Sequence, residues 1–194
     1  MKEALDFLKA LKLNNDREWF NANKSKFQQS SEEFKSFTSL LIAGINEFDD
    51  SVGSVDPKDC IFRIYRDVRF SHDKAPFKSN FGAYIAKGGR KSPYAGYYFH
   101  LDAEASFASG GIYMAPTEVM KRIREDIDLY PEEFLAILNE KKFKETFQFF
   151  DEDKLKRVPQ GFDKDSPVSE YLKFKHITPY HSLSEKDIAD KNLL

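Results

Sequence analysis

The sequence lacks the cysteine pairs that form disulfides and the long apolar runs that cross a membrane. Cys60 is the only cysteine among 194 residues, which excludes an internal disulfide and any zinc motif built from several cysteines. No uninterrupted apolar run approaches the roughly twenty residues that a membrane helix needs. Asp6 and Lys9 interrupt the only early apolar stretch, so no secretory leader is expected. These absences predict a soluble, cytoplasmic protein with no membrane partner.

The chain also has little excess charge. Its 30 Lys and Arg and 32 Asp and Glu give a net charge of -2 at pH 7, which disfavours a protein that coats a polyanion. The charge is unevenly placed, because residues 58–91 carry nine Lys or Arg and three Asp, so this stretch is +6 and the remainder is -8. Such separation predicts a positive site on an otherwise acidic protein.

Phenylalanine, by contrast, is abundant. With 41% hydrophobic residues and 19 Phe, we predict one domain over residues 1–194 with an aromatic core. The order of local signals predicts an α+β fold, with a mainly antiparallel sheet flanked by N-terminal and C-terminal helices. The predicted parts are N-terminal helices within 3–47, a sheet region over 60–113, helices within 116–150 and a mixed segment over 155–194.

Capping residues, prolines and hydrophobic periodicity predict the individual helices and strands. Asn15 is predicted to cap a long second helix, with Glu18 as its capping-box partner and a bend at Ser30-Ser31. Pro116 and Pro131 suit the first turns of two later helices. The predicted helices are 3–12, 16–47, 116–129, 131–139 and 141–150. The predicted strands are 60–70, 96–101, 105–112 and 171–177, and residues 81–86 are either a short strand or an irregular segment.

The strand predicted over 60–70 is unusual because three arginines lie on it. Arg63, Asp67 and Arg69 share one face, and Asp67 lies between the two arginines, about 7 Å along the strand from Arg69 and about 13 Å from Arg63. Asp67 can therefore hold one guanidinium while the other remains free. Arg66 interrupts the apolar row on the opposite face, where a buried arginine needs either an internal carboxylate or a bound anion as its partner.

These cations predict a pocket for a phosphorylated or carboxylated small molecule. Guanidinium groups fit such anions because their donors form a rigid fork. Arg66 and Arg69 would bind the anion, Lys74 and Lys78 would close over it, and Asp67 would orient the guanidinium groups. The predicted ligand-binding residues are Arg63, Arg66, Arg69, Lys74, Lys78, Tyr98 and Lys175.

The same stretch carries a recognisable pattern. Arg63-x-x-Arg66-Asp67-x-Arg69-Phe70-Ser71-x-Asp73-Lys74-x-Pro76-Phe77-Lys78 resembles the signature of the conserved microbial domain of unknown function family 2461. Supporting matches are Asn14-Asn15-x-Arg17-x-Trp19-Phe20-x-x-Asn23-Lys24, Gly96-Tyr97-Tyr98-x-His100, Gly110-Gly111, Pro116, Arg124 and Lys175, so the resemblance covers essentially the whole chain.

The resemblance implies a single domain and no particular activity. Two positions depart from the family pattern: Phe77 stands where tyrosine is usual, which argues against a catalytic phenol there, and Tyr113 stands where tryptophan is usual. Members of the family tend to continue with a further helical segment, so a terminal helix is expected to be missing or shortened after Leu194.

A second set of polar residues lies on the predicted hairpin. Tyr98, His100 and Asp102 share one face of a strand, where His100 is a candidate general acid or base near neutral pH. The interpretation that we favour is simpler: a partly exposed histidine hydrogen-bonded to a neighbour. Asp67 is the other catalytic candidate. No metal and no cofactor is predicted, because the carboxylates and histidines show no ligand spacing.

The sequence is compatible with three functions, and catalysis is an open alternative in the first of them. The leading one is the anion-binding pocket. The second is a nucleic-acid-binding module, in which the interleaved aromatic residues stack on bases. The third is a non-catalytic scaffold, in which protein carboxylates neutralise all three arginines internally.

Overall fold

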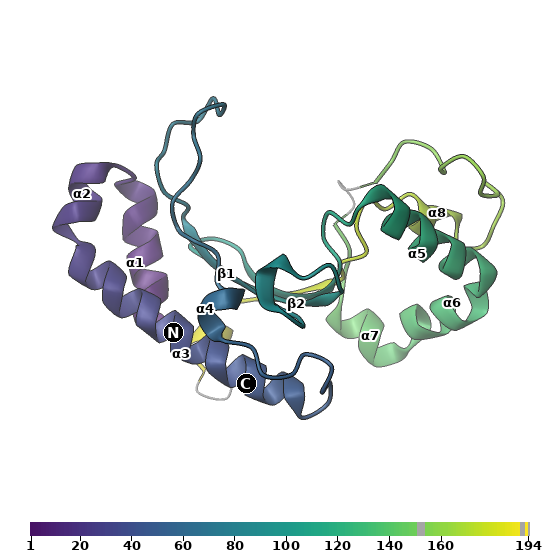
Figure 1. The fold of residues 1–194 in the computed structure, drawn as a ribbon, viewed down its shortest axis with the longest axis horizontal. Coiled ribbons are helices and arrows are strands. Elements are labelled where there is room, and N and C mark those ends of the chain that lie inside the picture. Colours follow the sequence, from purple (N-terminus) through teal and green to yellow (C-terminus); the bar gives the residue numbers. More distant parts are fainter. Residues whose placement is uncertain (151–153, 191–192, 194) are drawn as a thin grey trace. The chain divides into compact units, whose positions relative to one another are not determined.

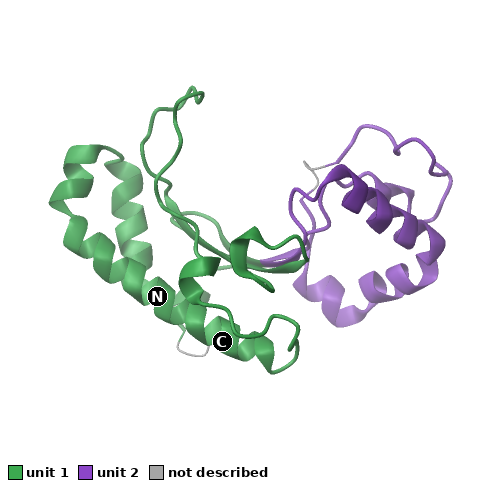
Figure 2. Cartoon of the chain, viewed as in Figure 1, with its two compact units in different colours: residues 1–108, 182–194 green, residues 109–181 purple. Residues whose placement is uncertain are grey.

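The computed structural model describes residues 1–150, 154–190 and 193. They form two compact units, which are coloured separately in Figure 2. Unit 1 comprises residues 1–108 and 182–194, and unit 2 comprises residues 109–181. That residues 1–194 form a single domain stays a prediction.

The elements follow the predicted order of helices, then strands, then helices (Figure 1). Unit 1 begins with α1 (Lys2–Leu13), α2 (Arg17–Ala22), α3 (Lys24–Asn46) and α4 (Pro57–Cys60), and it also contains β1 (Asn80–Ile85), a 3-10 turn η1 (Gly89–Lys91), β2 (Gly96–Asp102) and α9 (Glu185–Ala189). Unit 2 contains α5 (Thr117–Leu129), α6 (Pro131–Asn139), α7 (Lys141–Thr146) and α8 (Ser169–Leu172). Two strands, β3 (Ser106–Gly111) and β4 (Tyr180–Leu183), have residues in both units.

The sheet has the strand order β1-β2-β3-β4 in the described part of the chain, which confirms the predicted α+β fold. β1 and β2 are antiparallel, with Gly82 opposite His100 and Ala83 opposite Phe99. Because side chains alternate along a strand, Ala83 and Phe99 point to one face while Gly82 and His100 lie on the other. The first face packs on α1 and α3 in a buried cluster.

Aromatic side chains dominate this core, as the phenylalanine content predicted. Phe34 packs between Phe81 of β1 and Phe99 of β2, with ring centroids 5.3 and 6.3 Å apart. Phe20 of α2 stacks on Phe77 at 3.9 Å, with the ring planes 12° apart. Aromatic contacts therefore join α3 to β1 and β2, and join α2 to the segment that precedes β1.

The predicted start and bend of the second helix are wrong. Asp16, one residue after the predicted cap, accepts a hydrogen bond from the Trp19 N–H and caps α2. The helical stretch is interrupted at Asn23, which separates α2 from α3, and α3 runs unbroken through Ser30. Ser30 is buried and its hydroxyl bonds the Glu3 carbonyl, so tertiary packing outweighs its weak helix preference.

The strand predicted over 60–70 is also wrong. Single antiparallel bridges join Ile61 to Ala83 and Tyr65 to Phe77, with no continuous ladder between them. The Phe62 N–H donates to the Gly82 carbonyl, and the Lys78 N–H donates to the Ile64 carbonyl. Residues 62 and 64 are two positions apart, whereas their partners at 82 and 78 are four positions apart. This bulge interrupts the pairing, and the chain beyond Tyr65 turns away into a loop.

Two predictions for unit 2 also need correction. The helix predicted over 141–150 ends at Thr146. Residues 171–177 do not form the returning strand, because α8 occupies the start of this range and Phe174 and Ile177 make only isolated bridges; the strand that joins the sheet is β4. Alternating residues fit extended coil as well as a strand, so the pattern alone was insufficient.

No helix among the described residues is both long enough and apolar enough to cross a membrane.

Candidate functional site

Three of the six sequence-predicted cations, Arg66, Arg69 and Lys74, lie on one loop of unit 1. Residues 66–76, here called the arm, extend from the sheet as a long hairpin loop (Figure 1). Its base is closed by Arg66, whose N–H donates to the Pro76 carbonyl at 3.0 Å. The Arg66 guanidinium also donates to Asp73 Oδ2 at 2.5 Å and to the Ala75 carbonyl at 3.1 Å. Of the two partners predicted for Arg66, the structure supplies the internal carboxylate.

The remaining cations of the arm are engaged in the same way. Arg69 donates Nε to Asp67 Oδ1 at 2.9 Å and Nη2 to Oδ2 at 2.6 Å, a bidentate pair that lowers the pKa of Asp67. Lys74 Nζ donates to the Val68 carbonyl at 3.1 Å. Two arginines and one lysine of the predicted pocket are thus bonded within the arm.

Arg63 and Lys78 differ from these residues. Across the described residues, neither the Arg63 guanidinium nor the Lys78 amine has a hydrogen bond or an ion pair. Lys78 is partly buried, and its Nζ lies 5.6 Å from the centre of the Phe62 ring. Burial, and secondly the positive charge of Arg63, lower the pKa of Lys78. These two side chains form a pair of cations without an ion pair among the described residues, and the charge of Arg63 acts on Asp67 only as a minor cause of its lowered pKa.

Asn15 holds the backbone next to Lys78. Its side-chain amide donates to the Phe77 carbonyl at 2.9 Å, and its side-chain oxygen accepts from the Phe77 N–H at 3.1 Å. The sequence pattern predicted Asn15 as a helix cap and did not indicate its contact with Phe77. The available signal was chemical, since an asparagine amide can satisfy both polar groups of one residue of backbone.

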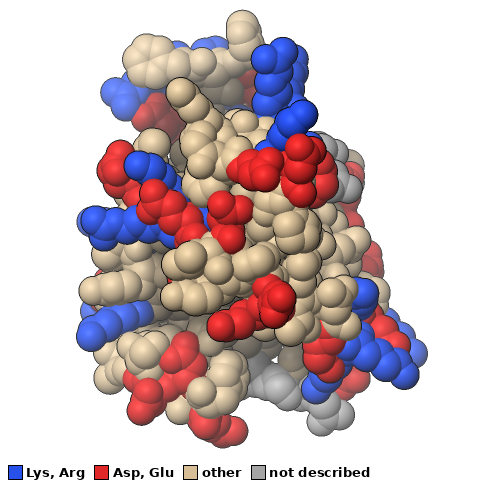
Figure 3. All heavy atoms as spheres, turned by 90° about the vertical axis from the view of Figure 1, so that its right-hand side faces the viewer, with Lys and Arg blue, Asp and Glu red and all other residues tan. Residues whose placement is uncertain are grey.

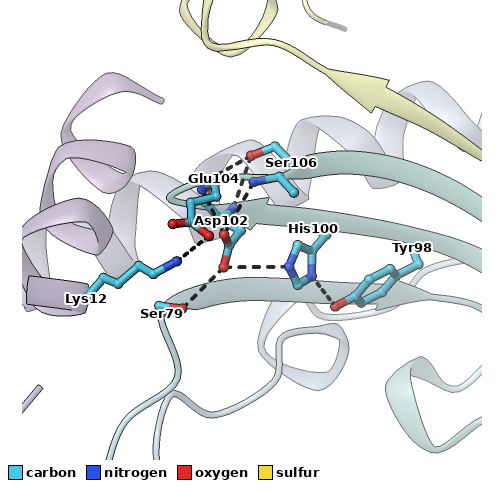
Figure 4. A network of polar contacts seen from close by, with 8 residues as sticks. Lys12, Ser79, Tyr98, His100, Asp102, Glu104 and Ser106 are labelled. Atoms are coloured by element: carbon cyan, nitrogen blue, oxygen red, sulfur yellow. Dashed lines mark hydrogen bonds and ion pairs between the residues drawn. The ribbon is translucent and has the colours of Figure 1, made fainter.

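The polar residues on β2 form a row on the face turned away from α1 and α3 (Figure 4). The Tyr98 hydroxyl lies 2.9 Å from His100 Nδ1, and His100 Nε2 lies 4.0 Å from Asp102 Oδ2. The side chains of His100 and Asp102 are only 20% and 17% exposed. The prediction that these three residues share one face is confirmed.

Asp102 is fixed at the end of this row by several neighbours. Its Oδ1 accepts from the backbone N–H groups of Glu104 and Ala105 at 2.8 and 3.4 Å. Its Oδ2 accepts from the Ser79 hydroxyl at 3.3 Å, and the Asp102 N–H donates to Ser106 Oγ at 3.1 Å. The turn after β2 therefore orients one carboxylate oxygen towards His100, as Figure 4 shows.

Gly82 makes room for the Tyr98 ring. It lies opposite His100 in the sheet, and a Cβ atom at this position would lie 2.6 Å from the Tyr98 hydroxyl oxygen. His100 is covered on its other side by Phe107, whose ring is nearly parallel at 4.7 Å between centroids. The role of Gly82 was not predicted from the sequence, although a glycine inside a strand often marks the close approach of another group.

The charges around His100 favour its neutral form. Burial is the largest cause that lowers the pKa of His100, and the positive charge of Lys78 lowers it further. Asp102 opposes both by favouring the imidazolium. Lys78 therefore lies within electrostatic reach of the row on β2.

The remaining predicted site residue, Lys175, is exposed and belongs to unit 2. In unit 1, a hollow of about 350 Å³ opens between α1, α2 and α3, lined by Phe7, Trp19 and polar side chains rather than by the arm or Lys78. Within the described residues, no three His, Cys, Asp or Glu side chains gather closely enough to hold a metal ion.

Fold and geometry define an α+β protein whose sheet face carries a tyrosine–histidine–aspartate row next to an unneutralised pair of cations. The chain belongs to the family described as conserved hypothetical protein, DUF2461, whose model matches residues 3–194. This match confirms the resemblance inferred from the sequence motifs. No curated protein and no solved structure matches the chain.

Proposed function

We propose that the protein binds a small phosphorylated or carboxylated molecule on the sheet face of unit 1, with Lys78 and Arg63 supplying the positive charge. The observation that carries the proposal is the pairing state of the cations: Arg66 and Arg69 each have a carboxylate partner, whereas Arg63 and Lys78 have none among the described residues. A partly buried ammonium next to another cation is unfavourable unless a counter-ion is present.

The neighbours of Lys78 fit a small ligand. Phe62 lies beneath the amine and its ring contacts Tyr98 edge-on, with the centroids 6.3 Å apart. Aromatic walls with a few polar groups are typical of small-molecule sites. Asn15 holds the backbone of the preceding residue, Phe77, so the position of Lys78 does not depend on the ligand alone.

The other two functions have less support. Internal neutralisation, which the scaffold function requires of all three arginines, applies to Arg66 and Arg69 and not to Arg63. A nucleic-acid module would favour a broad basic surface. On the face shown in Figure 3, basic side chains are interspersed with acidic ones, and the net charge of the chain is only -2.

Thermal stability in the presence of anions tests the proposal. The wild-type protein is heated with sulfate, nucleotides, sugar phosphates and dicarboxylates, and we expect at least one class to raise the melting temperature. Lys78→Met should remove this effect, since it deletes the charge and keeps an apolar side chain of similar length. Lys87→Met, an exposed lysine from the same basic stretch, is the matched control and should respond like the wild type.

Arg69→Met separates the proposed site from the arm. Because Asp67 already occupies the Arg69 guanidinium, the anion effect should persist in this variant. The proposal fails if no anion stabilises the wild type, or if Arg69→Met abolishes the effect while Lys78→Met preserves it.

A further inference from the structure

We propose that the row of Tyr98, His100 and Asp102 takes up a proton when an anion binds at Lys78, so that His100 and Tyr98 act as a general acid towards the bound molecule. This inference rests on the proposed function, because it requires an anion at Lys78. It adds a reaction class, proton transfer to a phosphorylated or carboxylated ligand.

The contacts of the row favour one arrangement of its hydrogens. Asp102 Oδ2 faces His100 Nε2 at 4.0 Å, which favours the tautomer with the proton on Nε2. Nδ1 then carries the lone pair and accepts from the Tyr98 hydroxyl at 2.9 Å. Asp102 is held by the turn N–H groups of Glu104 and Ala105, so the orientation of the imidazole is set before any ligand arrives.

Protonation reverses one hydrogen bond in the row. When His100 gains a proton on Nδ1, that nitrogen becomes a donor, and the Tyr98 oxygen must accept from it. The Tyr98 hydroxyl hydrogen is then released to turn towards a ligand oxygen. If the ligand takes this proton, Nδ1–H returns its own proton to the tyrosine oxygen, and the row ends neutral with no other bond made or broken.

The surroundings of His100 provide the link to anion binding. On its own strand, Asp102 favours the charged imidazolium and Tyr98 is an uncharged partner. Lys78 reaches the row through Phe62: its Nζ lies 5.6 Å from the centre of the Phe62 ring, and this ring contacts Tyr98, the partner of His100. From this position Lys78 opposes the charged form, while Gly82 on β1 and Phe107 on β3 bring no charge. An anion that neutralises Lys78 removes this opposition and adds a negative charge nearby, so the pKa of His100 rises.

Calorimetry with sulfate tests the coupling, because sulfate itself does not titrate near neutral pH and any proton taken up must go to the protein. The heat of binding is measured at about pH 6.5 in two buffers of different ionisation enthalpy. A rise in the pKa of His100 corresponds to net proton uptake on sulfate binding, which appears as a difference between the heats measured in the two buffers. The affinity for sulfate should then decrease as the pH is raised above this range.

Variants assign the proton to the row. His100→Gln should abolish the uptake and make the affinity for sulfate independent of pH over the same range. His72→Gln, an exposed histidine of the arm, is the matched control and should retain the uptake. Tyr98→Phe removes the acceptor of the Nδ1 proton and should reduce the uptake, which NMR titration of the His100 ring can follow independently.

The outcomes separate the two proposals. Sulfate binding that depends on Lys78 but takes up no proton, or takes up the same fraction in His100→Gln, overturns this inference and leaves the anion site standing. Failure of the wild type to bind sulfate or any of the other anion classes overturns both. Uptake that disappears in His100→Gln and persists in His72→Gln supports the inference.

Discussion

Asn15 offers the sharpest test of how the candidate site is held in place. Its side chain makes two hydrogen bonds to the backbone of Phe77, at 2.9 and 3.1 Å, directly before Lys78. Asn15→Ala removes both and leaves a partly buried N–H and carbonyl without these partners. A typical hydrogen bond contributes about 1 kcal/mol, and leaving partners unsatisfied adds to the loss, so we expect the free energy of unfolding to fall by about 2 kcal/mol.

Urea unfolding followed by tryptophan fluorescence measures this change. Trp19 is the only tryptophan and lies on α2, one helical turn from Asn15, so its signal reports on unit 1. The adjacent residue supplies the control: the Asn14 side chain bonds only the Ala10 carbonyl on an exposed surface, and Asn14→Ala should cost less than about 0.5 kcal/mol. Equal losses in the two variants would refute the positioning role of Asn15.

Three further predictions concern single buried groups. Gly82→Ala should displace the Tyr98 ring, because its methyl would lie 2.6 Å from the phenol oxygen; a shifted His100 NMR signal in a folded protein is expected, and an unchanged signal would contradict it. Because the pKa of His100 lies below its ordinary value of 6.5, the unfolded chain binds more protons as the pH falls through this value, and stability should decrease there. Lys78→Met should raise that pKa and reduce the decrease, as urea unfolding on either side of the transition would show. Burial raises the pKa of Cys60 to about 11, so a thiol reagent should react far more slowly with the folded protein than with the unfolded one; equal rates would argue against its burial.

The helices with strong local signals were predictable. Proline placed the starts of α5 and α6 to within a residue or two, since proline is tolerated in the first turn of a helix and disrupts its interior. The β2–β3 hairpin followed from alternation. The prediction of a strand over 60–70 was wrong. Its residues favour extended structure, but a continuous ladder with β1 also requires a pairing register, and the sequence does not reveal that register.

The candidate site was predictable only where it is local in sequence. Alternation placed Tyr98, His100 and Asp102 on one face, and the composition of the basic stretch identified Lys78. Which cations are neutralised depends on how the arm folds back, as with Arg66 and Asp73, seven residues apart. Contacts between distant segments have no periodic signature, so the chemistry of the Asn15 amide allowed a backbone partner but did not identify Phe77 as that partner.

The location of a bound oxyanion tests the central claim most directly. Crystals grown with sulfate and soaked with selenate would show the anion by its anomalous scattering. We expect a peak within hydrogen-bonding distance of Lys78 Nζ, about 3 Å, with Arg63 turned towards it and Arg66 still bonded to Asp73. A peak confined to the arm, or a Lys78 amine paired with a protein carboxylate and no peak beside it, would contradict the account.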